Sequence, residues 1–377
     1  MTVPSTPIRS RVSMQGLSFI ELMVSLTIGS IMIIGAVSVY GSSRSTYAVN
    51  DALGRLQEQA RYVMSVVEPD VALGGYYGFT NSPDTLRLVV GANPGTVLAS
   101  APALRQRPLP PLAAAPVPAP GLPGSAQACG TNFAVDVLTP VQGSNDTFAL
   151  GPGAAGACDP WGAGAALLTD TLTVRRVSTE ASVAEAGRLQ VYAARLSSRT
   201  SQQIFFDGVA PGPLDADHVI HDLMVRSYYV ARDSVDRAGV PALRVKSLTR
   251  VGGAAAFVDT EVMPGVEDLQ VQFGIDTGDY DNDGNIDPAA DINNDGIPES
   301  DGRATRYVDA DFPGLDRLQI VSVRLWIRVR AEQAEQGFVD NRTYRYANVA
   351  FTPVGAQRNF RRVLLARTVA LRNARIL

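Results

Sequence analysis

One segment near the N-terminus limits the fold and cellular location of this chain more than any other. Residues 17–40 read LSFIELMVSLTIGSIMIIGAVSVY, in which Glu21 is the only charged residue, and the next charge is Arg44. At about 1.5 Å of rise per residue, a helix of this length crosses the roughly 30 Å hydrocarbon core of a membrane. The run is longer than the apolar core of a secretory signal and lacks its small-residue ending. The sequence therefore predicts a membrane-spanning helix.

The residues before this run predict its orientation. Residues 1–16 are polar and carry two cations, Arg9 and Arg11. Positive charge beside a membrane helix favours the cytoplasmic side. We therefore expect a single pass, with the N-terminus in the cytoplasm and the rest of the chain exported.

Glu21 is unusual because it lies inside the apolar run. An ionisable side chain there costs about 3 kcal/mol and usually has a partner and a role. The alternative is an interfacial glutamate that reaches the lipid headgroups. From Glu21 alone, both interpretations stay open.

The residues around Glu21, GLSFIELM at positions 16–23, resemble the signal of type IV prepilins. In that family a prepilin peptidase cuts after the glycine and methylates the new N-terminal residue. The resemblance implies cleavage between Gly16 and Leu17, although leucine replaces the usual phenylalanine. Glu21 matches the glutamate at the fifth position of the mature chain. In a bundle of apolar helices, this carboxylate would neutralise the N-terminal ammonium of a neighbouring subunit and so fix the register.

The helix is expected to continue as an amphipathic half. Apolar residues recur at spacings of three and four, with charged residues between them. These positions are Val49, Leu53, Leu56, Ala60, Val63, Met64 and Val67. Pro69 should kink or interrupt the helix, and Gly74-Gly75 should end it. The predicted parts are a leader (1–16), a membrane and filament-core helix (17–43), an amphipathic half (44–75) and a head (76–377).

Alternating side chains predict that the head is rich in β-strands. In residues 318–330 the apolar positions alternate with polar ones; they are Val321, Val323, Leu325, Ile327 and Val329. Residues 171–177, 225–232 and 362–371 are further predicted strands. The insert at residues 92–127 is rich in proline and alanine and is expected to be a surface loop of polyproline type. We expect an α+β, pilin-like fold, with the long N-terminal helix packed on a C-terminal antiparallel sheet.

Two segments at opposite ends of the mature chain resemble PilW-type minor pilins. They are QEQARYVMSVVEPDVALGGYYGF at residues 57–79 and RRVLLARTVALRN at residues 361–373. The resemblance implies a structural subunit of a type IV pilus that acts in pilus assembly or initiation, near the tip. Its partners would be the prepilin peptidase, other minor and major pilins, and the inner-membrane assembly platform. The head would lie in the periplasm and then in the extracellular pilus, whose role in motility, adhesion or DNA uptake stays open.

Two other roles stay open. A minor pseudopilin of a type II secretion system shares the N-terminal motif. A calcium-dependent adhesin on the pilus is the other role, and it is compatible with a function in pilus assembly. The sequence contains no Gly-x-Ser-x-Gly, P-loop, dinucleotide-binding or His-Glu-x-x-His motif. We therefore do not expect an enzyme. A net charge of −4 without a basic patch gives no reason to expect nucleic-acid binding.

An aspartate-rich loop at residues 276–302 predicts calcium binding. Alternating carboxylates around a glycine suit a hard cation that needs six or more oxygen ligands. The ligand positions are Asp279, Asp281, Asp283, Asn285 and Asp287 in a first register, and Asp291, Asn293, Asp295, Ile297 and Glu299 in a second. The bidentate glutamate of an EF-hand is absent, so the loop resembles the short calcium loops of thrombospondin type 3 or dockerin repeats. The alternative is a solvated acidic loop.

The chain has two cysteines, Cys129 and Cys158. Two cysteines alone cannot complete a zinc site, and they do not form a Cys-x-x-Cys motif. In an exported region a disulfide is the expected outcome. The alternative is a pair of small, unpaired apolar residues.

Overall fold

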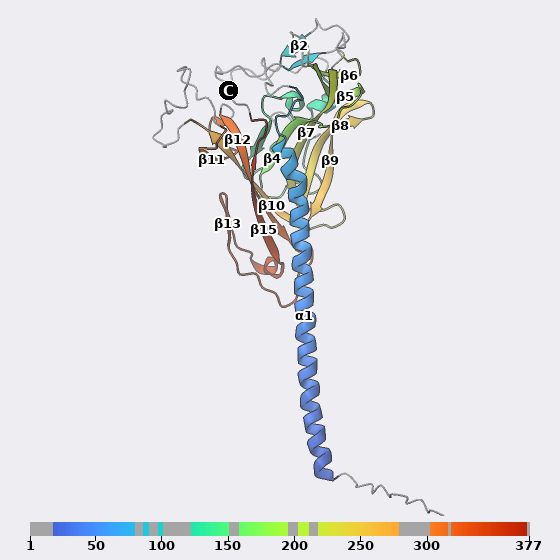
Figure 1. Ribbon diagram of the computed structural model, residues 1–377, viewed down its shortest axis with the longest axis vertical. Helices are drawn as coiled ribbons and strands as arrows, with labels where there is room; N and C mark the ends of the chain where they lie inside the picture. The colour runs from blue at the N-terminus through green and yellow to red at the C-terminus, as the bar shows by residue number, and fades with distance from the viewer. Residues whose placement is uncertain are drawn as a thin grey trace, which may run out of the picture. The chain divides into compact units, whose positions relative to one another are not determined.

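The computed structural model describes residues 18–79, 86–89, 97–100, 122–150, 158–194, 203–210, 218–278, 302–315 and 318–374. The chain divides into two compact units, Met1–Arg55 and Leu56–Leu377. A single helix, α1 (Phe19–Ala72), contributes to both (Figure 1). The described strands all belong to the second unit, and they all lie in the head, residues 76–377.

Helix α1 is 54 residues long and contains Pro69 in its last turn. Of the two predicted effects of Pro69, a kink or an interruption, the interruption does not occur. A proline removes one backbone hydrogen bond, and this loss is small near a helix end. The helix goes on to Ala72, and the Leu73 N–H still donates to the Pro69 carbonyl at 3.1 Å. Gly74 and Gly75 follow directly, with Gly75 at φ +79°, so the glycine pair ends the helix as predicted.

The head contains two main sheets and one separate hairpin. The larger sheet has the order β2-β1-β6-β5-β7-β4-β3, with β8 paired to β7 and β9 paired to β8. The smaller has the order β11-β10-β12-β15, and β13 and β14 pair only with each other. The strands are β1 (Arg87–Val89), β2 (Val97–Ser100), β3 (Val141–Ser144), β4 (Thr171–Val177), β5 (Ala186–Ala194), β6 (Gln203–Asp207), β7 (His218–Ala231), β8 (Ala242–Val251), β9 (Ala254–Pro264), β10 (Val266–Asp276), β11 (Arg306–Asp309), β12 (Gln319–Arg330), β13 (Tyr344–Tyr346), β14 (Val349–Phe351) and β15 (Arg362–Ala370). Short 3-10 helices are η3 (Gly124–Gln127), η4 (Phe133–Val135) and η6 (Gly355–Asn359).

The strands predicted from alternation are present. Residues 171–177 form β4, and the other three predicted segments correspond to the end of β7, to β12 and to β15. The five apolar residues of β12 all face the core; they are Val321, Val323, Leu325, Ile327 and Val329. The four-stranded sheet is antiparallel throughout. The α+β fold, with one long N-terminal helix and an antiparallel sheet region, is confirmed.

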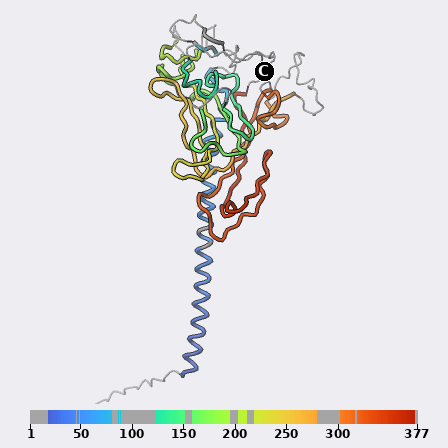
Figure 2. The backbone as a smooth tube through the Cα atoms, turned by 180° about the vertical axis from the view of Figure 1, so that it is seen from behind, coloured from blue at the N-terminus to red at the C-terminus, as the bar shows by residue number. Residues whose placement is uncertain are grey.

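The last turns of α1 complete the main core of the head. The buried residues of this helical stretch are Leu56, Ala60, Val63, Met64, Val67 and Val71. They pack with apolar residues of both main sheets, as the amphipathic pattern predicts. In Figure 1 these turns lie in front of the strands, and from behind, in Figure 2, the strands lie in front of the helix. Both sheets therefore depend on α1 to cover their apolar faces.

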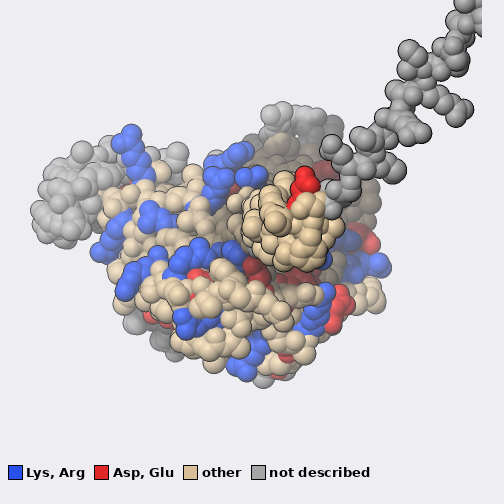
Figure 3. All heavy atoms as spheres, turned by 90° about the horizontal axis from the view of Figure 1, so that it is seen from below, with Lys and Arg blue, Asp and Glu red and all other residues tan. Residues whose placement is uncertain are grey.

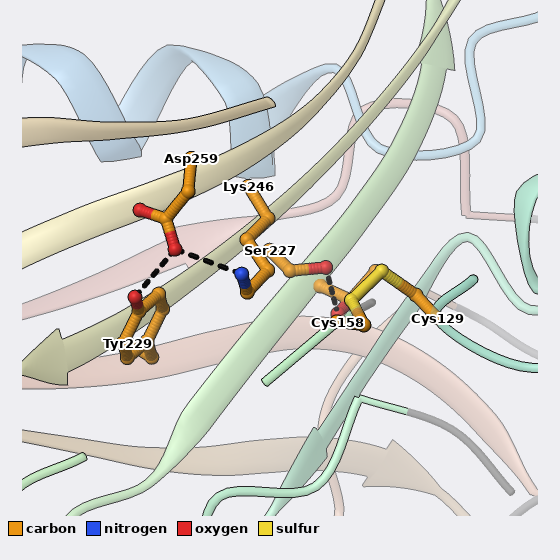
Figure 4. The surroundings of a disulfide bond; sticks show 7 residues. Cys129, Cys158, Ser227, Tyr229, Lys246 and Asp259 are labelled. Atoms are coloured by element: carbon orange, nitrogen blue, oxygen red, sulfur yellow. Dashed lines mark hydrogen bonds and ion pairs between the residues drawn. A yellow bond between two sulfur atoms is a disulfide. The ribbon is translucent and has the colours of Figure 1, made fainter. Parts of the chain in front are cut away.

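A second core surrounds a disulfide between Cys129 and Cys158, whose Cα atoms are 4.9 Å apart. The predicted pairing is confirmed. Figure 4 shows this disulfide beside polar side chains of β7, β8 and β9. There the only lysine of the chain, Lys246, donates to an oxygen of Asp259 at 2.8 Å. The Tyr229 hydroxyl donates to the same oxygen at 2.6 Å. The charge of the buried Lys246 is therefore balanced by Asp259, which is itself held in place by Tyr229.

Most of the proline-rich insert, residues 92–96 and 101–121, lies outside the described residues. Its described parts are residues 97–100, which form β2, and residues 122–127, which include η3. Residues 97–100 read VLAS and contain no proline, so they can pair with β1 in the sheet. For these two parts the prediction of a polyproline loop is wrong.

Candidate functional site: the N-terminal helix and its anchor in the head

The apolar part of α1 exposes its side chains along its whole length. An 18-residue window has a mean hydropathy of 2.2, and none of it is buried by other described residues. Phe19, Ile31 and Ile34 are each about two-thirds exposed or more, at 75%, 70% and 69%. A contiguous apolar surface of this size requires lipid or other apolar helices around it. The helix is long and apolar enough to span a membrane.

Three hydroxyl groups in this stretch are hydrogen-bonded within the helix. Ser25 donates to the Glu21 carbonyl at 2.7 Å, Thr27 donates to the Val24 carbonyl at 2.8 Å, and Ser30 donates to the Leu26 carbonyl at 2.7 Å. Such bonds to preceding carbonyls satisfy polar groups without an external partner. In lipid there is no water to bond to, so a polar group must find its hydrogen-bond partner within the protein. Ser25, Thr27 and Ser30 therefore do not oppose an apolar environment.

Glu21 is the one charged group in this stretch, and its side chain is exposed in the first turn of α1. Figure 3, viewed from below, shows the near end of the helix as a largely uncharged surface. A carboxylate is favoured near the N-terminal end of a helix by the helix dipole. The predicted cleavage residues Gly16 and Leu17 lie outside the described residues.

The last turn of α1 carries a buried acid that anchors the helix to the larger sheet. Asp70 is 2% exposed. One of its oxygens accepts from Arg176 of β4 at 2.6 Å, and the other accepts from Arg226 of β7 at 2.8 Å. The hydroxyl of Tyr228 donates to the second oxygen at 2.5 Å. A single carboxylate thus joins the helix to two strands of the sheet.

The ionisation of Asp70 depends on these partners. Burial opposes the charged form, but the charge of Arg226 and the hydrogen bonds from Tyr228, Arg226 and Arg176 together hold the pKa of Asp70 below its ordinary value of 3.8. Asp70 is therefore ionised throughout the neutral range. An ion group buried in this way is strongly destabilised when one member is removed.

A second buried ionic cluster lies on the outer side of the four-stranded sheet. Arg362 of β15 has a side chain with no exposed surface and donates to both oxygens of Glu267, at 2.7 and 3.0 Å. It also lies 3.4 Å from Asp340, another side chain without exposed surface. The hairpin β13–β14 supplies Tyr344, whose hydroxyl donates to Asp340 at 2.8 Å. This cluster fastens residues 331–361 onto the sheet.

Neither ionic cluster was predicted from the sequence, although one signal was present. Asp70 follows Val63 and Val67 at helical spacings of seven and three, so it occupies the apolar stripe. An acid at such a position predicts a buried cation partner. The adjacent Arg175 and Arg176 were available in a predicted strand. For the cluster of Arg362, which joins residues 95 positions apart, the sequence contains no comparable local signal.

The predicted calcium ligands lie outside the described residues, as does all of residues 279–301. Among the residues that the structure does describe, no group of three histidine, cysteine, aspartate or glutamate side chains is arranged to hold a metal ion.

The layout of an exposed apolar N-terminal helix whose last turns complete an antiparallel β-sheet head is that of a pilin-like protein. Residues 227–373 match the family described as PilW, type IV pilus-assembly protein W. This match over the C-terminal part of the chain supports a PilW-like type IV pilus protein. The matched range begins within β7 and contains the whole four-stranded sheet. No curated protein and no solved structure matches the chain.

Proposed function

We propose that this protein is a minor pilin, a structural subunit that helps to initiate type IV pilus assembly near the pilus tip. The observation that carries the proposal is a single helix with two different surfaces. Its first part is apolar and exposed, with Glu21 as the only charge up to Arg44. Its last part is buried in a head that is PilW-like. The exposed apolar part of the helix suits packing against other helices in a filament. The buried part fixes the head to the helix, so that the head is carried on the outside of the filament.

The same chain would occupy two environments in turn. Before assembly the apolar part of α1 would span the inner membrane, with the head in the periplasm. The prepilin peptidase would cut after Gly16 and methylate Leu17. The assembly platform would then transfer the subunit into the filament, where helices of other minor and major pilins replace lipid. There Glu21 would face the N-terminal ammonium of a neighbour, and a wrong register would leave both charges unpaired.

Processing is the first test of this proposal. We expect the mature chain to begin at Leu17 and to carry one methyl group on its N-terminal nitrogen. Mass spectrometry of the intact chain from a host with and without the peptidase measures both. The variant Gly16→Arg should keep the full leader, whereas Ser18→Ala, two residues away, should be processed normally. A mature N-terminus at any other residue would contradict the assignment.

Incorporation is the second test, and it concerns Glu21. The variant Glu21→Ala should insert into the membrane at least as well as the wild type, because the cost of a buried carboxylate disappears. Its incorporation into sheared pili should fall by about tenfold or more, since the neighbouring ammonium loses its partner. Quantitative immunoblots of membrane and pilus fractions measure the two amounts. The control is Glu58→Ala, which removes an exposed acid of the same helix; equal incorporation of both variants would refute the role of Glu21.

We further propose that the aspartate-rich loop binds calcium. Without a bidentate glutamate, each site should have a dissociation constant of about 10⁻⁴–10⁻³ M, as in extracellular calcium modules. At about 1 mM free calcium, mass action then stabilises the head by roughly 0.4–1.4 kcal/mol per site.

The expected result is a melting temperature a few degrees higher in calcium than in chelator for the full chain in detergent. Asp281→Ala combined with Asp283→Ala should remove most of this shift, while Asp51→Ala combined with Glu58→Ala removes the same charge from α1 and should preserve it. Magnesium should substitute poorly because it requires tighter octahedral geometry. Calorimetry without binding at millimolar calcium would leave the loop as a solvated acidic segment.

A further inference from the structure

Strand β15 is the edge of the four-stranded sheet and is bonded on one side only. It pairs with β12 over nine consecutive residue pairs without a register shift. Among the described residues, no strand pairs with its other side. The strand is therefore long, regular and open.

The hydrogen bonds at its two ends determine which backbone groups are open. The Leu371 N–H donates to the Val321 carbonyl at 2.9 Å, and the Ala331 N–H donates to the Arg361 carbonyl at 2.8 Å. In an antiparallel pair, every second residue forms hydrogen bonds to the partner strand. The backbone N–H and C=O groups of the odd-numbered residues of β15 therefore point toward β12, and those of the even-numbered residues point away. The open N–H and C=O groups belong to Leu364, Ala366, Thr368 and Ala370. Within the described part of the chain, no hydrogen bond reaches these backbone groups.

These groups are also accessible. Ala366, Arg367 and Thr368 are three consecutive exposed residues in the middle of the edge. The side chains of Ala366 and Thr368 are small, so they do not screen the backbone. Just beyond the strand this side is occupied, because the Arg372 N–H donates to the Ala72 carbonyl of α1 at 3.1 Å. The open stretch therefore covers residues 364–370.

The other sheet edges of the head are protected, which sets β15 apart. Strands β2, β3 and β11 have four residues each, and short edges are poor templates for pairing. Strand β9 is longer, but its register shifts between the pairs of Leu243 and Arg244, and it ends in Pro264. Its Ala255 carbonyl also accepts from Ser125 at 2.5 Å. Strand β15 has neither a bulge nor a proline, and residues 366–368 in its second half are exposed.

The charge of this edge indicates what kind of segment fits. Residues 361–373 contain four arginines and no acid. Arg367 is 63% exposed, and its one acidic neighbour is Glu68 at 3.9 Å. Arg372 is exposed as well. A second copy of this strand would bring like charges together, whereas an acidic segment would be attracted.

We infer that the open edge of β15 is a docking site for an extended, acidic segment of a different protein, which joins the four-stranded sheet as a fifth strand. Backbone hydrogen bonds to Leu364, Ala366 and Thr368 would provide the affinity. Carboxylates of the segment, placed beside Arg367 and Arg372, would make an acidic segment bind better than a basic one. The edge belongs to the head alone, so its function can be tested without pili.

Proline substitution separates edge pairing from folding. The Ala366 N–H faces away from β12, so Ala366→Pro removes only an open donor and is compatible with an edge strand. Ala366→Ser keeps the donor and is the matched control. Thr368→Pro with Thr368→Ser is a second pair at the next open position. Thermal melting of the full chain in detergent checks that each variant folds.

The probe is a fluorescent peptide of about twelve residues in which valine alternates with glutamate, compared with one in which valine alternates with lysine. Fluorescence anisotropy should show that the glutamate peptide binds the wild type and both serine variants equally. A folded proline variant should bind it about tenfold more weakly or worse, and so should the wild type with the lysine peptide. No binding of the glutamate peptide to the wild type, or equal binding to a folded proline variant, would overturn the inference. So would a wild-type dimer in light scattering that Ala366→Pro dissociates, because the occupant would then be a second copy.

Discussion

Replacing Asp70 by alanine is expected to lower the free energy of unfolding of the head by about 3–5 kcal/mol. The change removes the carboxylate with which Arg176 and Arg226 form their ion pairs. It also leaves the hydroxyl of the buried Tyr228 without its acceptor. Urea unfolding of the full chain in detergent measures this loss. Tryptophan fluorescence suits the experiment because both tryptophans, Trp161 and Trp326, lie in the head.

The matched control for Asp70 is Glu68→Ala. Glu68 lies in the same turn, but its side chain is 46% exposed and its pair with Arg367 is long, at 3.9 Å. Its removal should change the unfolding free energy by less than about 0.5 kcal/mol. A loss below about 1 kcal/mol for Asp70→Ala would mean that the cluster does not anchor the helix.

Asp70 also predicts a pH dependence. Its pKa is lower in the folded head than the ordinary 3.8 of the unfolded chain, so the unfolded state binds more protons in that window. The stability that Asp70 contributes is complete above pH 3.8 and is lost as the pH falls through the folded pKa. The free energy of unfolding of Asp70→Asn should therefore fall less than that of the wild type as the pH is lowered. Urea unfolding of both proteins at descending pH measures this difference.

Replacing Arg362 by methionine is expected to cost about 3 kcal/mol or more. Methionine fills much of the same volume, but Glu267 loses two hydrogen bonds and the buried Asp340 loses its nearest buried cation. The measurement is again urea unfolding by tryptophan fluorescence. Arg345→Met is the control, since Arg345 lies on the nearby β13 with an exposed side chain.

A double variant distinguishes charge from packing at Arg362. Asp340→Asn alone should destabilise the head, because Tyr344 and Arg342 also bond to this carboxylate. Combined with Arg362→Met, it should cost less than the sum of the two single losses, because no unpaired charge at position 340 is left behind. Strict additivity would show that Arg362 acts through packing alone.

The sequence was informative wherever a local pattern determines structure. The helix of α1 follows from an apolar run and then a stripe with spacings of three and four, and β12 follows from strict alternation. These patterns fix which side of an element is buried, without fixing which element covers it. The order of the strands, and the separate pairing of β13 with β14, depend on contacts between distant residues. No periodicity in the chain encodes them.

The same distinction explains the candidate site. Glu21 was found because a charge in an apolar run is conspicuous within a few residues. Asp70 was missed because its partners Arg176 and Arg226 are 106 and 156 positions away. The interruption expected at Pro69 does not occur for a related reason: the proline rule describes an isolated helix, whereas here the residues after Pro69 are bonded to the head. Tertiary bonds at Asp70 outweigh one lost backbone hydrogen bond.

The way in which α1 ends has a mechanical consequence. The last turns of the helix are not a tether that could slip out of the head, because their apolar side chains are core residues and Asp70 is bonded to two strands. A pulling force applied along the helix is therefore transmitted to β4 and β7 together. The weakest point under tension is then the fold of the head itself, and the helix and the head should separate only when the main core opens.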